Sequence, residues 1–411
     1  MDSTAPPSEI ADIIIVGAGP TGGTLALAAA QSGLKVVLLD ARSRTDRNKR
    51  DGRNFAIVRG SWALLNSVGL AEAIGDTAEP LNGLEAVDGG THWFGAPWAL
   101  FDTDDLPIRD DGTPLGYMVE AEKLQTAIDN ALENEENIDW QADTRFDTVE
   151  FETGRAVVAI ENGKSLRTRL LIGCDGVNSP VRNTAGITTE GREYGKSVFA
   201  ANVKLSKPHQ GIARQLFTPE GPFATLPLSG NRANLAWYMK TGAAETMAAM
   251  DKGNIEAELN ARFAHFAGDM TLEGKAIAYP LILQIANEMI APRIALVGDA
   301  ARRINPLAGQ GLNLGLKDVA ALAEVLEDSA RAGLDIGSLN VLERYQSWRR
   351  FDANSTALGL DIIDRVFSND NAVLKPLRGL GLLAANRLRP VRRALARQAS
   401  ADQKSLPKRM R

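Results

Sequence analysis

The chain has 411 residues, 44% of them hydrophobic, and a formal net charge of −5 at pH 7. This length predicts two or more domains, or one large one. A single cysteine excludes a disulfide framework, and three scattered histidines offer no metal-ligand spacing, so we expect no metal site. The sequence shows no signal-peptide pattern, no run of 18 apolar residues and no Gly-x-Ser-x-Gly motif. These absences argue against secretion, a membrane span and a serine hydrolase, and they predict a cytoplasmic protein.

The first predicted elements form a β-α-β unit. Residues 10–16 are a short apolar run rich in β-branched side chains, as in a buried parallel strand. A helix at 24–31 and a second strand at 35–39 follow, and the turn before the helix carries Gly17, Gly19 and Gly22. Such glycines permit a tight turn and close approach to a pyrophosphate, and the helix N-terminus attracts phosphates. Asp40 ends the second strand, where an acidic residue suits a ribose diol. This unit fits NAD or the adenosine half of FAD.

The middle of the chain predicts further strands and helices. The basic loop 41–60 contains Arg53, which is either a ligand of phosphates or ribose or one of several solvated arginines. The segment 83–117 is β-rich, and 119–134 is an amphipathic helix. Further strands are expected at 148–152, 156–161, 166–172, 197–205, 212–217, 223–227, 234–239 and 293–297, and further helices near 61–68, 255–266 and 311–327.

Three glycine–aspartate signals stand out from these elements. The first is the glycine motif that begins at Gly17, the second is Cys174-Asp175-Gly176, and the third is Gly298-Asp299. Each signal alone is weak. Their order and spacing together predict a flavin dinucleotide that lies along a sheet in a two-domain oxidoreductase.

The motifs around these signals resemble those of class A flavoprotein monooxygenases, and most of all the ubiquinone-biosynthesis hydroxylases. The resemblance covers residues 10 to about 397, and its most specific part is the run from Gly298 to Asp318. Other matching motifs are Asp51-Gly52-Arg53, Gly116-Tyr117-Met118-Val119-Glu120, Arg192-Glu193-Tyr194-Gly195, Phe217-Thr218-Pro219-Glu220-Gly221-Pro222 and Leu226-Pro227-Leu228.

The resemblance implies roles for particular residues. Asp299, after Gly298, would bind the ribityl chain of FAD, and Asp175 would lie near the pyrophosphate and the nicotinamide donor. The following loop would place backbone N–H groups at the flavin N1–C2=O edge, where negative charge develops on reduction. Its candidate residues are Pro306, Gly309, Gly311, Leu312 and Asn313. Two positions depart from the family: Arg302 stands where histidine is usual, and Gln125 is the candidate for a contact that a basic residue usually makes.

The implied fold class is α/β, with a Rossmann-like FAD-binding domain, an interleaved antiparallel-sheet substrate domain and a helical C-terminal region. We expect the FAD-binding domain at 1–82, 118–195 and 288–335, the substrate domain at 83–117 and 196–287, and the C-terminal region at 336–411.

The implied activity is FAD-dependent hydroxylation of the aromatic ring of a prenylated phenol in ubiquinone biosynthesis. The reaction would use O2, with NAD(P)H or another electron donor, and would pass through a flavin C4a-hydroperoxide. Because the cofactor carries this chemistry, we assign no catalytic side chain. Three alternatives stay open: another aromatic hydroxylase, an FAD-dependent isoprenoid reductase, and a non-catalytic assembly subunit that keeps a structural FAD. A flavin halogenase is disfavoured, because its Trp-x-Trp-x-Ile-Pro motif is missing.

The C-terminal tail has a different charge from the rest of the chain. Residues 375–411 contain eleven Lys or Arg and one acid, which gives about +10 and leaves about −15 for the remainder. Leucines alternate with these charges, so the tail is either a helix packed on its own domain or a basic amphipathic surface at the inner face of a membrane or within a biosynthetic complex. An acidic body argues against nucleic-acid binding.

Overall fold

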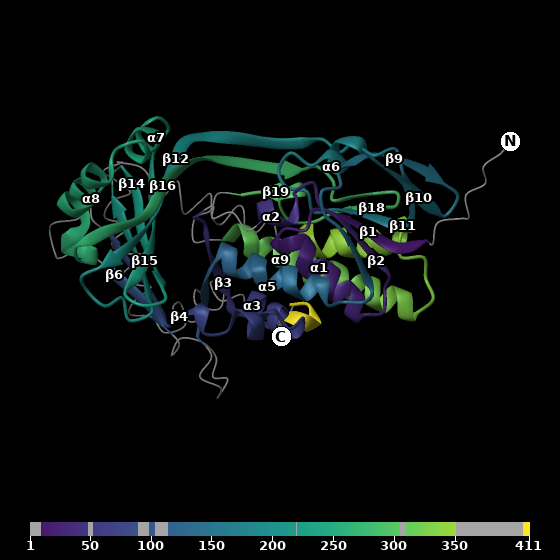
Figure 1. Cartoon of the computed structure of the whole chain (residues 1–411), viewed down its shortest axis with the longest axis horizontal. Coiled ribbons are helices and arrows are strands. Elements are labelled where there is room, and N and C mark those ends of the chain that lie inside the picture. Colours follow the sequence, from purple (N-terminus) through teal and green to yellow (C-terminus); the bar gives the residue numbers. More distant parts are fainter. Residues whose placement is uncertain are drawn as a thin grey trace.

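The computed structural model describes residues 10–47, 52–88, 98–102, 114–218, 220–304, 310–350 and 406–411. Figure 1 shows a mixed helix–sheet region at one end, a strand-rich region with α7 and α8 at the other, and two long strands that run between them. The long strands are β12 (Thr189–Leu205) and β16 (Met270–Ala286), and they pair antiparallel. Each strand therefore belongs to both regions.

The first sheet has a parallel centre, with the strand order β17-β18-β11-β1-β2-β8. β9 and β10 extend it as an antiparallel hairpin from β11. The strands are β1 (Ala11–Val16), β2 (Val36–Leu39), β8 (Ile138–Gln141), β9 (Phe146–Glu152), β10 (Arg155–Ile160), β11 (Ser165–Gly173), β17 (Ile290–Ala291) and β18 (Ile294–Leu296). The sequence explains the central position of β1. Successive side chains of a strand point to opposite faces of the sheet, and Ile13, Ile14 and Ile15 are all fully buried, so the sheet must be covered on both faces at β1.

Helices α1 (Pro20–Gln31), α5 (Ala121–Glu133) and α9 (Gln310–Arg331) pack side by side below this sheet (Figure 1). α1 is almost entirely apolar and is buried on most of its surface, because it lies between α5 and α9. Pro20 occupies its first turn, where a missing N–H costs nothing. Because α1 begins directly after the glycine turn that follows β1, its N-terminus faces the carboxyl end of this strand.

The second sheet has the order β19-β16-β12-β15-β14-β13-β5-β6. Its remaining strands are β5 (Gly83–Asp88), β6 (Trp98–Asp102), β13 (Ile212–Thr218), β14 (Gly221–Leu228), β15 (Arg232–Lys240) and β19 (Arg302–Arg303). The expected antiparallel character is wrong at one place, because β13 and β5 are parallel. β5 comes from a distant part of the chain, so no hairpin fixes its direction.

The second sheet has its own core against α7 (Ala243–Ala248) and α8 (Lys252–Ala267). Phe223 and Phe263 stack with ring centroids 3.7 Å apart, and Trp237 meets Phe263 edge-on at 4.9 Å. A small sheet of β3 (Asn54–Val58), β7 (Gly116–Glu120) and β4 (Glu79–Leu81) lies between the two regions. The shorter helices are α2 (Arg44–Arg47), α3 (Arg59–Ser67), α4 (Leu70–Ile74), η1 (Gly75–Thr77), α6 (Pro180–Thr184), η3 (Gly298–Ala300) and η5 (Lys408–Met410), and residues 339–350 are also helical.

Candidate cofactor and substrate site

The three glycine–aspartate signals meet at one edge of the first sheet. The parallel strands β18, β11, β1 and β2 are neighbours in this order, and their carboxyl ends lie together. The segments that follow them are, respectively, Gly298-Asp299, Cys174-Asp175-Gly176, the glycine motif and Asp40. The fold thus gathers residues as far apart in the chain as Gly17 and Asp299, at the edge where α/β sheets bind their ligands.

Each glycine of the first motif meets a different constraint. Gly17 has φ +99°, and a Cβ there would lie 2.5 Å from the carbonyl oxygen of Cys174. A Cβ on Gly22 would lie on the carbonyl oxygen of Gly17, so this position needs glycine for helix–turn packing. A Cβ on Gly19 meets no atom of the described chain within 4 Å, and Gly19 lines a cavity. The open side of the turn is therefore at Gly19, beside the N-terminus of α1.

Asp40 is buried and organises this turn. One carboxylate oxygen accepts a hydrogen bond from the backbone N–H of Ala18 at 2.8 Å. The other accepts the backbone N–H of Arg42 at 2.8 Å, and the Arg42 guanidinium lies 3.3 Å from it. From α5, the amide of Gln125 donates to the carbonyl of Ala18 at 3.2 Å. Asp40 and Gln125 thus hold the glycine turn from two sides, and both line the cavity.

Asp175 follows β11 with one carboxylate oxygen bound and the other unsatisfied. The backbone N–H of Val181 donates to Oδ2 at 3.0 Å, whereas the buried Oδ1 has no hydrogen-bond partner within the described chain. Burial raises the pKa of Asp175, although hydrogen bonds and the nearby Arg182 charge oppose the shift. Burial also raises the pKa of the neighbouring Cys174 thiol well above its ordinary value, so this thiol stays protonated.

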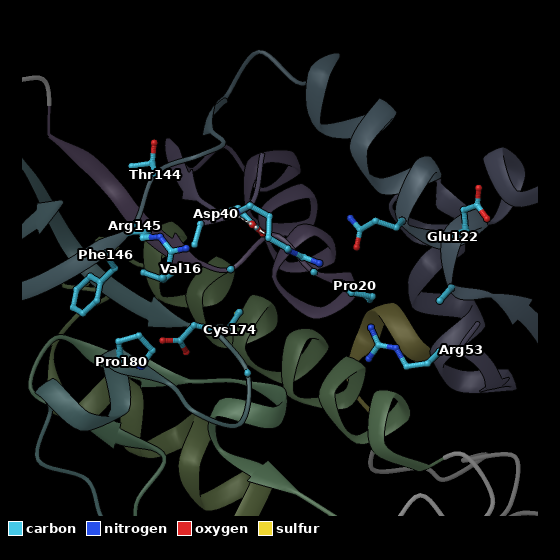
Figure 2. Close-up of a pocket in the computed structure, with 18 of the residues that line it drawn as sticks. Val16, Pro20, Asp40, Arg53, Glu122, Thr144, Arg145, Phe146, Cys174 and Pro180 are labelled. Carbon is cyan, nitrogen blue, oxygen red and sulfur yellow. Dashed lines mark hydrogen bonds and ion pairs between the residues drawn. The ribbon is translucent and has the colours of Figure 1, made fainter. Parts of the chain in front are cut away.

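These residues line a cavity of about 560 Å³. Figure 2 shows Thr144, Arg145 and Phe146 at one end of it and Arg53 and Glu122 at the other, with Asp40, Pro20 and Cys174 between them. The cavity is therefore elongated along the carboxyl edge of the sheet. An elongated cleft at a helix N-terminus and a glycine turn suits a dinucleotide, because phosphates lie at the turn and the ribose at the acidic residue.

A second cavity of about 510 Å³ continues from the first and lies between the two sheets. The two cavities share Gly19, Pro20, Arg53, Phe55, Cys174 and Gly176. One wall of the second comes from Val297 to Asp299 and from the start of α9 at Gly311 and Leu312. The opposite wall is the second sheet, with Ala200, Asn234, Ile277, Ala278, Tyr279 and Ile282. A ring at the end of the dinucleotide would therefore face the strand-rich region.

Asp299 is the acidic group on the wall of the second cavity. Its side chain is accessible to solvent because it faces the cavity, yet the surrounding protein desolvates it enough to raise its pKa. The charges of Arg303 and Arg53 oppose this shift. Tyr279, across the cavity, also has a raised pKa because of burial, so its hydroxyl stays neutral and can donate a hydrogen bond.

The structure distributes the other predicted site residues unevenly. Gly298, Gly311 and Leu312 line the second cavity, and Gly22 supports the turn without lining either cavity. Asn313 lines neither cavity: its buried side chain accepts the N–H of Val58 at 3.0 Å and donates to the carbonyl of Ala56 at 2.7 Å. Pro306 and Gly309 lie outside the described residues.

Sequence reasoning did not single out several residues of these cavities. Arg42 was detectable as a basic residue two positions after Asp40. Arg145 and Tyr279 have no sequence signal, because they reach the site only through the pairing of distant strands.

Within the expected helical C-terminal region, residues 339–350 are helical, whereas residues 351–405, with most of the basic tail, lie outside the described residues. The described residues resume at Leu406. This last segment is docked on the first region, with Leu406 and Met410 buried. Lys408 lies 3.0 Å from Asp328, and Arg409 lies 3.9 Å from Glu327, both on α9. Two of the tail's positive charges are therefore paired with the protein itself.

No group of three or more His, Cys, Asp or Glu side chains within the described ranges could hold a metal ion. The described helices also include none with the length and hydropathy that a membrane crossing requires.

Comparison with known proteins relates this geometry to one family. Residues 10–354 match a family model described as "FAD binding domain". The chain is 36% identical over 406 residues to ubiquinone hydroxylase UbiL of Rhodospirillum rubrum, covering 98% of this chain and 92% of the relative. It is 34% identical over 400 residues to 3-demethoxyubiquinol 3-hydroxylase of Escherichia coli, covering 96% of this chain and 99% of that protein.

Solved structures share the fold at lower identity. The p-nitrophenol 4-monooxygenase PnpA of Pseudomonas putida superimposes with a TM-score of 0.77 at 21% identity, covering 95% of this chain and 97% of the other. A variant of Klebsiella pneumoniae HpxO, solved in complex with FAD, gives 0.75 at 18% identity, covering 97% and 99%.

Proposed function

Because the chain belongs to the FAD-binding-domain family of class A monooxygenases, among the ubiquinone-biosynthesis hydroxylases, we propose that it hydroxylates the aromatic ring of a prenylated phenol on the route to ubiquinone. The observation that carries this proposal is the continuity of the two cavities. A dinucleotide in the first would present its redox ring in the second, opposite a wall that belongs to another sheet.

The residues present fit FAD. The open face at Gly19 leaves room for a pyrophosphate, and the N-terminus of α1 supplies N–H groups for it. Asp40 and Asp299 line the first and second cavities, and we assign Asp40 to the adenosine ribose and Asp299 to the ribityl hydroxyls. The backbone N–H groups at Gly311 and Leu312 are proposed to face the N1–C2=O edge of the flavin. When bound, FAD supplies the redox chemistry that activates O2, with NAD(P)H as electron donor.

The second wall suits an aromatic substrate with an apolar substituent. Ile277 and Ile282 provide apolar surface, whereas Tyr279 and Asn234 provide polar groups at the same wall. A neutral Tyr279 hydroxyl can donate to a phenol oxygen and so orient the ring. A phenol is already activated towards electrophilic oxygen, so we assign no general base.

The test is a matched pair of measurements. Purified holoprotein should consume NAD(P)H and O2 when a prenylated phenol is added, and mass spectrometry should find a product heavier by one oxygen atom. Cells that lack the protein should accumulate the precursor without that hydroxyl group. Hydrogenation of the prenyl chain without O2 uptake would instead identify an isoprenoid reductase. Normal ubiquinone in the deleted cells would contradict the proposed pathway.

We keep the expected domain division as part of this proposal: an FAD-binding domain at 1–82, 118–195 and 288–335, and a substrate domain at 83–117 and 196–287. The separate cores of the two sheets support it. β12 begins at Thr189 within the first of these domains, so the boundary at 195 falls inside a strand.

We also propose that the basic tail associates with an anionic membrane surface, where a prenylated substrate is found. Each Lys or Arg near such a surface contributes about 1 kcal/mol. Because Lys408 and Arg409 are paired with α9, the contact would depend on the charges before them. The test replaces four arginines by glutamine and measures sedimentation with anionic vesicles at low salt; they are Arg387, Arg389, Arg392 and Arg393. Undiminished binding would exclude this role for them.

A further inference from the structure

Behind the wall of the second cavity lies a buried cluster of three charged side chains, Arg302, Asp318 and Arg349. Their exposed fractions are 6%, 0% and 2%. One carboxylate oxygen of Asp318 accepts two hydrogen bonds, from Arg302 Nη2 at 2.6 Å and from Arg349 Nε at 2.7 Å. The cluster joins β19, α9 and the helix at 339–350, and its formal charges sum to +1.

The cluster is one hydrogen bond away from the cavity. The other carboxylate oxygen of Asp318 accepts the backbone N–H of Gly298 at 3.1 Å, and Gly298 with Asp299 lines the cavity. Asp318 also lies on α9, whose start at Gly311 and Leu312 forms the same wall. A charge at this place therefore acts on the cavity through a short path in a poorly screened interior.

Arg302 shares its acidic partner with a second arginine. Asp318 is the one carboxylate that pairs with Arg302 within the described chain, and the same oxygen also accepts a hydrogen bond from Arg349. Arg302 Nη1 has no hydrogen-bond partner within the part of the chain that the structure describes, and Nη2 has only Met289 Sδ at 3.6 Å besides Asp318. The buried guanidinium of Arg302 is therefore incompletely hydrogen-bonded.

We propose that Arg302 and Asp318 are positioning residues that set the reduction potential of bound FAD, with the Arg302 charge raising it. Reduction adds negative charge to the flavin, and a fixed positive charge behind the wall stabilises that state. The Asp318 carboxylate has the opposite effect and also fixes the Gly298-Asp299 turn. This inference rests on the FAD site proposed above, and it does not depend on which substrate is hydroxylated.

The sign of each substitution separates this electrostatic role from a structural one. Arg302→Met removes the charge with a side chain of similar length and leaves the ion pair between Asp318 and Arg349 in place, so the protein is expected to fold. Its flavin should be reduced less readily, by about tenfold in the equilibrium, or about 30 mV for two electrons. Arg302→Lys should stay near the wild-type potential, because it keeps the charge. Arg331→Met, which removes an exposed arginine from α9, the helix that carries Asp318, is the matched control.

Asp318→Asn should shift the potential in the positive direction, because an amide still accepts the Gly298 N–H but has no charge. If this variant does not fold, Arg349→Met replaces it and should shift the potential in the same negative direction as Arg302→Met. The measurement is anaerobic reduction of FAD-saturated protein against a reference dye, with FAD content determined for each variant. The proposal is overturned if Arg302→Met matches Arg331→Met, or if charge removal at Arg302 and Asp318 shifts the potential in the same direction.

Discussion

The acidic group at the wall of the second cavity allows a test in which two properties change in opposite directions. We expect Asp299→Asn to weaken FAD binding without destabilising the protein that lacks FAD. A hydrogen bond from a ribityl hydroxyl to a carboxylate contributes about 1.5–3 kcal/mol. The amide oxygen of asparagine can still accept this bond at about 0.5–1.5 kcal/mol, so the variant loses about 1–1.5 kcal/mol of binding free energy. At about 1.4 kcal/mol for each tenfold change, this raises the Kd for FAD by about 5-fold to about 12-fold.

The effect on stability follows from the direction of the pKa shift. Burial raises the folded-state pKa of Asp299, so the folded protein binds this proton more tightly than the unfolded chain does. Above the folded-state pKa, the ionised carboxylate therefore destabilises the FAD-free protein, and asparagine removes this cost. Wild-type FAD affinity should also fall as the pH decreases through this raised pKa, whereas the affinity of Asp299→Asn should not change over the same interval.

Asp335 provides the matched control. A hydrogen bond from Arg293 lowers the pKa of Asp335, so this carboxylate stabilises the fold above its ordinary pKa, and the contribution is lost as the pH falls through the lowered value. Asp335→Asn should lower stability by no more than about 1 kcal/mol, because the pair is partly exposed. Its FAD affinity should be unchanged.

The assays are flavin fluorescence titration of FAD-free protein and urea unfolding of the same samples. Wild-type FAD affinity in Asp299→Asn would refute the assigned contact. A loss of stability in the FAD-free variant would refute the reasoning from burial.

Two further predictions concern packing. Gly19→Val should fold, as judged by circular dichroism, yet contain little FAD, because its side chain would enter open space beside the helix N-terminus; Gly22→Val should instead lose folded structure through contact with the Gly17 carbonyl. Equal FAD content in folded Gly19→Val and wild type would show that the pyrophosphate lies elsewhere. Met410→Ala should lower the free energy of unfolding by about 2 kcal/mol, since Met410 is 2% exposed; unchanged urea unfolding would show that the docked C-terminal segment adds no stability.

Much of the fold and part of the site could be predicted from local sequence. The apolar run of β1, the glycines after it and Asp40 identify a dinucleotide-binding unit, because strand burial and turn geometry depend on neighbouring residues. The order of the three glycine–aspartate signals also predicted one shared ligand. Parallel strands place their carboxyl ends at one edge, and the structure confirms that the signals follow adjacent strands.

Tertiary structure alone decided which side chains meet. The rotation of α9 turns the Asn313 side chain towards β3, so the predicted cofactor contact at this position would be made by the backbone. Tyr279 reaches the second cavity through the pairing of β16 with β12, and Arg302 meets Arg349 only because two helices and a short strand converge on Asp318. Such contacts depend on strand register and helix rotation, which are fixed by packing over the whole molecule. The sequence by itself therefore determined the kind of ligand and the edge of the first sheet that binds it. Packing determined which side chains line the two cavities and which charged groups lie behind them.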